Sequence, residues 1–103
     1  LALSASINLV RHLQAVAAEA RCPVDIYELY DRLGPRIPLL TAVRPNGDTR
    51  IEELEAAGGT LGVMKRLSGL AHTQSLTSTG RTWAEELEAA PEPGAVIRTV
   101  DNP

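Results

Sequence analysis

Two histidines and one cysteine are the first side chains of this sequence to consider as metal ligands or nucleophiles. His12 and His72 lie far apart in the chain, and neither has a Cys, His or Asp at a spacing typical of a metal site. Cys22 has no second thiol with which to form a disulfide or hold an iron–sulfur cluster. We therefore predict structural or solvated histidines and an inert, packed Cys22, and we assign no catalytic, cofactor-binding or metal-binding residue.

Two further groups of residues could in principle do chemistry. The acidic cluster Glu85, Glu86 and Glu88 could supply paired carboxylates for acid–base catalysis, but acidic residues are also expected in the first turn of a helix. Gly58-Gly59-Thr60 could bind an anion through free backbone N–H groups, although it lacks the context of a phosphate-binding motif. We interpret the acidic cluster as a solvated helix face and the glycines as backbone geometry.

Charge argues against a nucleic-acid partner. The 103-residue chain has a formal net charge of −3, and Lys65-Arg66 is its only pair of adjacent basic residues. A protein that binds phosphate backbones needs clustered Lys and Arg. We expect this pair to lie on a solvated helix face.

No apolar stretch approaches the roughly 20 residues of a membrane span, and residues 1–20 contain charged side chains that a signal peptide lacks. A single cysteine makes an intracellular, cytoplasmic location the default expectation. Aromatic residues make up only 3% of the chain, with no Phe, so a core of aliphatic residues would be thin. We expect part of the apolar surface to pack against something outside this chain.

The elements that must position these residues are mainly helical. Helical spacing and capping residues predict five helices, the first capped by Ser6 and ending at Cys22-Pro23, and the second capped by Asp25 and ending at Gly34-Pro35. The other three are predicted to start at the Thr49 capping box, at Thr60 and at the Thr82 capping box. A Pro45–Asp48 turn and short strands or extended segments at 37–43, 75–79 and 95–100 complete the prediction.

Several blocks of the sequence resemble, in order, the dihydroxy-acid dehydratase family, which includes the aldonate and phosphogluconate dehydratases. Residues 4–13 resemble its G-G-S-T-N-A-V-L-H-L segment, and residues 30–40 its F-D-R-I followed by P-L-L. Residues 52–65 are similar to E-D-L, A-G-G and V-M-K blocks, and residues 76–82 to L-T-V-T-G-K-T. Residues 96–103 resemble V-I-R-P-L-D-N-P. The succession spans nearly the whole chain.

The resemblance implies a lyase that removes water from a 2,3-dihydroxy acid, either a branched-chain precursor or an aldonate, to give a 2-oxo acid. It implies an iron–sulfur cluster and Mg²⁺ in the full-length parent, held by residues outside this stretch, and a homodimer or larger assembly. The expected fold is an α/β, mainly helical fragment from the centre of the parent, with 1–90 as the helical end of the N-terminal domain. Residues 91–103 would be a linker and first strand toward the C-terminal domain.

One loop carries the site residues that the resemblance suggests. Ser4-Ala5-Ser6-Ile7-Asn8 stands where the family pattern has G-G-S-T-N, so both glycines and the threonine are replaced. We take Ser6 and Asn8 as possible substrate-loop residues and expect a reshaped loop. Two interpretations of these replacements remain open. The parent could be a divergent but active enzyme, or it could have changed its substrate or lost its activity.

The chain alone should have no dehydratase activity, and its partners would be the remainder of the parent chain and the dihydroxy acid. The alternative is a small standalone, non-catalytic helical interaction module, or an inactive paralogue derived from the family.

Overall fold

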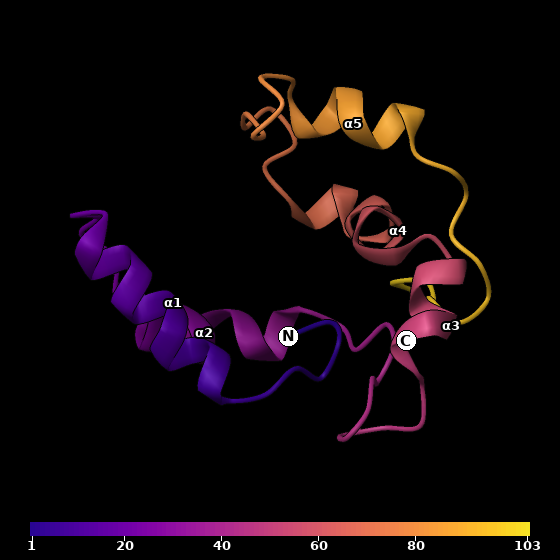
Figure 1. Ribbon diagram of the computed structural model, residues 1–103, viewed down its shortest axis with the longest axis horizontal. Helices are drawn as coiled ribbons and strands as arrows, with labels where there is room; N and C mark the ends of the chain where they lie inside the picture. Colours follow the sequence, from indigo (N-terminus) through magenta and orange to yellow (C-terminus); the bar gives the residue numbers. More distant parts are fainter.

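The computed structural model describes residues 1–103, and helices are its only regular elements (Figure 1). Three isolated β-bridges pair single residues, and no strand forms. In chain order the helices are α1 (Asn8–Glu19), α2 (Ile26–Leu33), η1 (Gly34–Arg36), α3 (Ile51–Ala56), α4 (Gly59–Arg66), η2 (Ser68–Leu70) and α5 (Trp83–Ala89).

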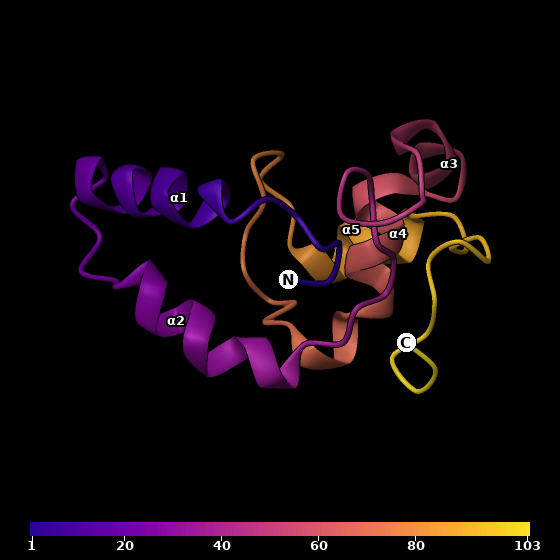
Figure 2. The ribbon, with the colours of Figure 1, turned by 90° about the horizontal axis from the view of Figure 1, so that it is seen from below.

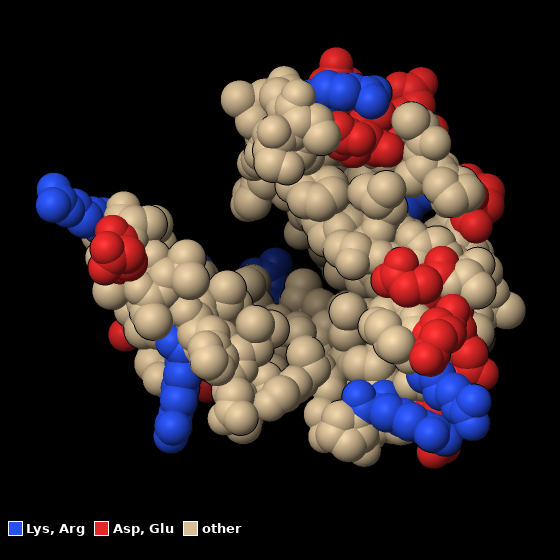
Figure 3. Space-filling view, viewed as in Figure 1, with Lys and Arg blue, Asp and Glu red and all other residues tan.

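The helices form two groups. Helices α1 and α2 pack on each other as a projecting hairpin, whereas α4 packs on both α3 and α5 to form a more compact body (Figures 1 and 2). The space-filling view shows a broad hollow between hairpin and body, with mostly uncharged walls (Figure 3). The radius of gyration is 14.3 Å, against about 13 Å for a compact domain of this length.

Three segments that are distant in the sequence meet in the core of the body. The amides of Leu40 and Thr41 donate to the carbonyl of Ala2 at 3.0 and 3.2 Å, and the amide of Arg98 donates to the carbonyl of Leu40 at 2.9 Å. Leu40 and Ile97 are fully buried. With Ala2 they belong to a core cluster completed by Leu54 of α3 and Val63 of α4.

The expected strands are therefore the main correction to the predicted fold. Residues 37–43 are an extended segment with one bridge, between Val43 and Thr49, and residues 75–79 have one bridge, between Leu76 and Thr82. The segment 95–100 is a turn with a bridge between Thr99 and Asn102. These apolar runs lie next to coil rather than next to strands that could extend a ladder. From the first and last of these segments Leu40 and Ile97 are buried in the core, whereas Leu76 is 72% exposed.

All five predicted helices are present, but two of them start at other residues, and α1 ends at Glu19, before the predicted Cys22-Pro23. Asp25 caps α2 by accepting from the Glu28 amide at 3.0 Å, and α2 ends before Gly34-Pro35 as predicted. Thr82 and Glu85 form the predicted capping box of α5. Of the remaining predicted caps, Thr49 and Thr60 are wrong.

At α3 the Thr49 hydroxyl accepts from the Thr41 hydroxyl at 3.1 Å and bonds to no amide of the helix. The first residue outside the helix is Arg50, whose amide donates to the Glu53 carboxylate at 2.7 Å. At α4 the helix begins at Gly59, because Gly58 turns the chain with φ of 112°.

Lys65 and Arg66 do not form the solvated face predicted for them. The Lys65 ammonium donates to the Ala90 carbonyl at 2.8 Å and pairs with Glu92 at 2.8 Å. The Arg66 guanidinium donates to the Pro93 carbonyl at 3.2 Å. Both side chains are half-buried, and they attach the segment after α5 to the end of α4.

Candidate functional site

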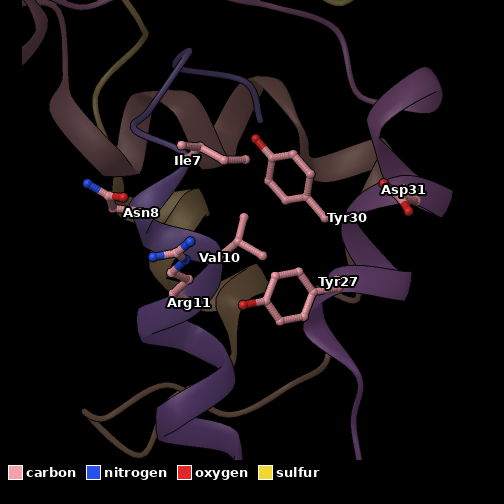
Figure 4. A pocket seen from close by; sticks show the side chains of 7 residues that line it. All are labelled: Ile7, Asn8, Val10, Arg11, Tyr27, Tyr30 and Asp31. Atoms are coloured by element: carbon pink, nitrogen blue, oxygen red, sulfur yellow. The ribbon is translucent and has the colours of Figure 1, made fainter.

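A pocket of about 310 Å³ lies between α1 and α2, on one side of the hairpin. It combines aromatic, aliphatic and polar side chains from both helices (Figure 4). The lining residues are Ile7, Asn8, Val10 and Arg11 from the start of α1, and Tyr27, Tyr30 and Asp31 from α2.

The pocket receives one of the two predicted substrate-loop residues. Asn8 lines it, whereas Ser6 does not. The Ser6 hydroxyl instead accepts from the Asn8 amide at 3.3 Å, just before α1 begins. Ser6 therefore has a local role at the helix start, close to the cap predicted for it, while Ile7 is the first residue outside the helix.

The loop before α1 keeps one backbone feature that its family pattern supplies with glycine. Ser4 has φ of 53°, in the left-handed region that glycine adopts without strain. Its carbonyl accepts from the Asn46 side chain at 2.6 Å, which ties the loop to the Pro45–Asp48 turn. Replacement of this glycine has thus not abolished the left-handed turn, although a reshaped loop was expected.

Gln14 fixes the relative position of the two helices that form the pocket. Its side-chain oxygen accepts from the Ile26 amide at 2.8 Å, and its side-chain nitrogen donates to the Val24 carbonyl at 3.5 Å. The first of these bonds satisfies an N–H group at the start of α2 that has no partner within the helix. The start of α2, which carries Tyr27 and Tyr30, is thereby held against the middle of α1.

The polar groups of the pocket are unoccupied by other parts of the chain. The side chains of Arg11, Tyr27 and Tyr30 make no hydrogen bond or ion pair within the protein. In Figure 4 both tyrosine rings project from α2 toward α1, with their hydroxyls leading, while Asp31 lies on the far side of α2. The pocket thus contains a free guanidinium and two free phenol hydroxyls.

The residues considered first in the sequence lie elsewhere. His12, His72 and Cys22 are all exposed, which agrees with solvated histidines. The predicted packing of Cys22 is wrong, because this residue follows the end of α1 in the exposed link between the two helices. No three His, Cys, Asp or Glu side chains come together as a possible metal site.

The acidic cluster serves the start of α5. Hydrogen bonds from the backbone and then the side chain of Thr82 hold the pKa of the Glu85 carboxyl below its ordinary value. Glu86 accepts from the Thr79 hydroxyl and lies 3.9 Å from Arg81, and Glu88 is exposed. These contacts are local and structural. A lowered pKa also keeps Glu85 ionised, so it is unsuited to act as a general acid at neutral pH.

The residues of this chain do not fit the cofactors that the family resemblance implies. An iron–sulfur cluster is held by several thiolates, and this chain has only Cys22. Mg²⁺ is held by carboxylates and other oxygen ligands. Asp31 is the only acidic side chain that lines the pocket. No chemical step is therefore assigned to either group within this chain.

The sequence did not single out Arg11, Tyr27 or Tyr30 as functional. What unites them is the packing of α1 on α2, which the spacing within each helix does not specify. Two tyrosines in a chain with only three aromatic residues, one helical turn apart, were the available signal.

Comparison with known proteins decides the family. Residues 1–86 match the family model described as dihydroxy-acid/6-phosphogluconate dehydratase, N-terminal. This chain belongs to that family. It is 42% identical over 106 residues to a dihydroxy-acid dehydratase of Caldanaerobacter subterraneus, and 42% over 106 residues to one of Pyrococcus furiosus. The dihydroxy-acid dehydratase of Mycobacterium ulcerans is 41% identical over 108 residues.

These comparisons confirm the family and correct the predicted position. Each alignment covers the whole of this chain and 19% of the dehydratase, so the chain spans about a fifth of the length of these relatives. The matching model is that of the N-terminal region, whereas a central segment was predicted. The comparisons give the non-catalytic alternative no support over the dehydratase interpretation.

None of the helices combines the length and the apolar character that a membrane span requires.

Proposed function

We propose that this chain is part of a hydro-lyase that converts a 2,3-dihydroxy acid into a 2-oxo acid. The observation that carries the proposal is similarity to dihydroxy-acid dehydratases along the entire chain, at 42% identity over 106 residues for one relative. In the reaction, the C2 proton and the C3 hydroxyl leave as water, and in the resulting enol C3 takes up a proton while the C2 hydroxyl loses one, which gives the 2-oxo acid. The branched-chain precursors of amino-acid biosynthesis and the sugar acids are the substrate classes that the resemblance suggests.

This chain alone is expected to be inactive, with the remainder of the parent supplying the catalytic groups. The resemblance implies an iron–sulfur cluster and Mg²⁺ held outside these residues, a homodimer or larger assembly, and a cytoplasmic location. Residues 1–90 would close the helical N-terminal domain, and 91–103 would lead toward a C-terminal domain.

The surface of the chain supports a larger parent. Its accessible area is 7238 Å², whereas a compact monomer of 11.0 kDa exposes about 5,600 Å². Large apolar side chains of the hairpin contribute to this area, among them Leu9 and Leu13, each 44% exposed. Contact with the rest of the parent would cover them.

Within the parent, we assign the start of α1 to the substrate side. The Asn8 amide in the pocket could donate to and accept from hydroxyl groups of a dihydroxy acid. Ser6 would hold the backbone of that loop through its bond to the Asn8 amide. Neither residue is expected to transfer the reacting proton.

The test begins with the native size of the protein. An antibody raised against this chain should detect a band several times heavier than 11.0 kDa in cells of the source organism. A band at 11.0 kDa would contradict the proposal, because a chain without cofactor ligands would then exist by itself.

The second step measures the reaction. The full-length protein, purified without oxygen and reconstituted with iron, sulfide and Mg²⁺, should form 2-oxo acid from either a branched 2,3-dihydroxy acid or an aldonate. Product is measured as its hydrazone, and the 103-residue chain treated in the same way is the negative control. Absence of product from both substrates, with the cluster verified by absorbance, would overturn the proposed activity.

A further inference from the structure

We propose that Asn46 is a positioning residue, which holds the loop before α1 and thereby sets the place of Asn8 toward the substrate. The inference rests on the proposed function, which assigns the start of α1 to the substrate side. It deepens that function by naming a residue outside the loop on which binding of the dihydroxy acid depends. Asn46 itself is not proposed to contact the acid.

The loop before α1 has one hydrogen bond to a distant part of the chain. The side-chain amide of Asn46 donates to the Ser4 carbonyl at 2.6 Å, across 42 positions of the sequence. All other hydrogen bonds of residues 4–8 are to neighbours in the sequence, such as the bond from the Asn8 amide to the Ser6 hydroxyl. Among hydrogen bonds, only the one from Asn46 therefore fixes this loop relative to the body.

This bond continues a series of backbone bonds between the two segments. Ala2 accepts from two amides of the segment before the Pro45–Asp48 turn, and Leu3 accepts from the Val43 amide at 3.3 Å. Ser4 is the next residue, and it takes a side-chain donor because the amides that follow Val43 bond within the turn. Figure 2 shows this stretch leaving α1 and running to the body.

The turn that carries Asn46 is itself firmly held. The amides of Asn46 and Gly47 both donate to the Val43 carbonyl at 3.1 Å. A Cβ at Gly47 would lie 2.3 Å from the Ala42 Cβ, so the turn is packed closely on the segment before it. A side chain can position a loop only if its own support is rigid, and this turn meets that condition.

The bond from Asn46 also holds a strained backbone. Ser4 has φ of 53°, and a residue other than glycine stays in the left-handed region only where its surroundings hold it there. Loss of the Asn46 donor would release Ser4 toward negative φ, and that rotation would displace residues 5–8. Asn8 would move with its loop, so the hydroxyl groups of the acid would lose a hydrogen-bonding partner.

Kinetics of the full-length, reconstituted protein test this role. Asn46→Ala should raise KM for the dihydroxy acid about fivefold and change kcat less than about twofold, because Asn8 is assigned to binding rather than to proton transfer. Asp48→Ala is the matched control, because Asp48 is exposed on the same turn and takes no part in the bond to Ser4. A lower kcat at unchanged KM, or an equal rise of KM in Asp48→Ala, would overturn the inference.

A double-mutant cycle tests whether Asn46 acts through Asn8. In the Asn8→Ala background, Asn46→Ala should raise KM less than about twofold, since the group that it positions is already absent. A rise of about fivefold in that background would show another route and would overturn the inference. Asn46→Asp keeps the size of the side chain without its donor, so it should act like Asn46→Ala and replaces that variant if alanine impairs folding.

Hydrogen exchange of the full-length protein separates this inference from the proposed activity. Peptides that contain residues 4–8 should exchange about threefold faster in Asn46→Ala, while peptides from α2 stay unchanged. If the full-length protein forms no 2-oxo acid, the dehydratase activity fails, and faster exchange still supports Asn46 as the residue that holds the loop. Equal exchange in variant and unchanged protein would overturn the inference whatever the activity.

Discussion

The hairpin and the body contain similar numbers of helices but differ in how their apolar residues are covered. In the hairpin only Val10 and Ala17 of α1 are buried, and α2 has no buried residue. In the body, Leu40 and Ile97 are fully buried against residues of α3 and α4. The hairpin is fixed mainly by local contacts, whereas the body depends on contacts between distant segments.

This difference shows which region buries its apolar side chains with its own residues. The body has a core made of its own residues, while the hairpin leaves large apolar side chains such as Leu13 and Val16 exposed at 44% and 63%. The pocket with unpaired Arg11 and tyrosine hydroxyls belongs to the incompletely covered part. These unpaired polar groups thus lie where folding makes the least use of side chains.

The largest effect should come from a cavity in the body. Leu40→Ala removes a fully buried side chain, and it should lower the free energy of unfolding by about 3 kcal/mol. Leu13→Ala, at a side chain that is 44% exposed in the hairpin, should cost under about 1 kcal/mol. Urea unfolding followed by circular dichroism measures both, and equal losses would remove the distinction between the two regions.

A smaller effect is expected from added volume at a glycine. In Gly47→Ala the new Cβ would overlap the carbonyl and Cβ of Ala42, so the Pro45–Asp48 turn must shift, at a cost of about 2 kcal/mol. Gly34→Ala, at the end of the hairpin, meets no atom within 4 Å and serves as the control. Urea unfolding measures both variants. A larger loss of stability for Gly34→Ala than for Gly47→Ala would contradict close packing at the Pro45–Asp48 turn.

A gain in stability is expected where the hairpin joins the body. Ser4→Gly relieves the strain of the left-handed backbone at φ of 53°. Glycine also has greater backbone entropy in the unfolded chain, which offsets part of this gain, so the free energy of unfolding should rise by about 0.5 kcal/mol. Ser75→Gly, outside the left-handed region, should lose stability instead. Thermal unfolding of the pair checks the sign, and a loss at Ser4 would indicate that its hydroxyl matters more than its backbone.

The smallest effect concerns acid, since both carboxylates involved are exposed. The bonds of Glu85 to Thr82, and of Glu92 to Lys65, lower the pKa of each carboxyl in the folded state. Their contribution is present above the unfolded value of 4.5 and is lost as the pH falls through the lower folded pKa. Thermal unfolding should therefore show a smaller loss at acidic pH for Glu85→Gln than for the unchanged chain, with Glu88→Gln as the control.

The sequence predicted the local parts of this fold better than its distant contacts. Asp25 and Thr82 act as predicted because a helix cap depends on a few neighbouring residues. The strand expected at 95–100 is absent because β-branched composition indicates an extended backbone but does not supply a partner.

The candidate site divides along the same line. Asn8 could be proposed as a site residue from its loop, because that loop is continuous in sequence. Asn8 lines the pocket. Arg11 and Tyr27 could not, because they belong to different helices, and only the packing of α1 on α2 brings them together. The ties of Lys65 and Arg66 to the segment after α5 were missed for the same reason.

The passage of both ends of the chain through the core has a consequence for synthesis on the ribosome. Leu40 is covered by Ala2 on one side and by the 97–98 segment on the other. The α1–α2 hairpin can form as soon as it leaves the exit tunnel, but the body must wait until residue 98 has emerged. Until then the core cluster lacks Ile97 and the Leu40 carbonyl lacks its bond from the Arg98 amide, so part of the later core is a surface that chaperones can bind.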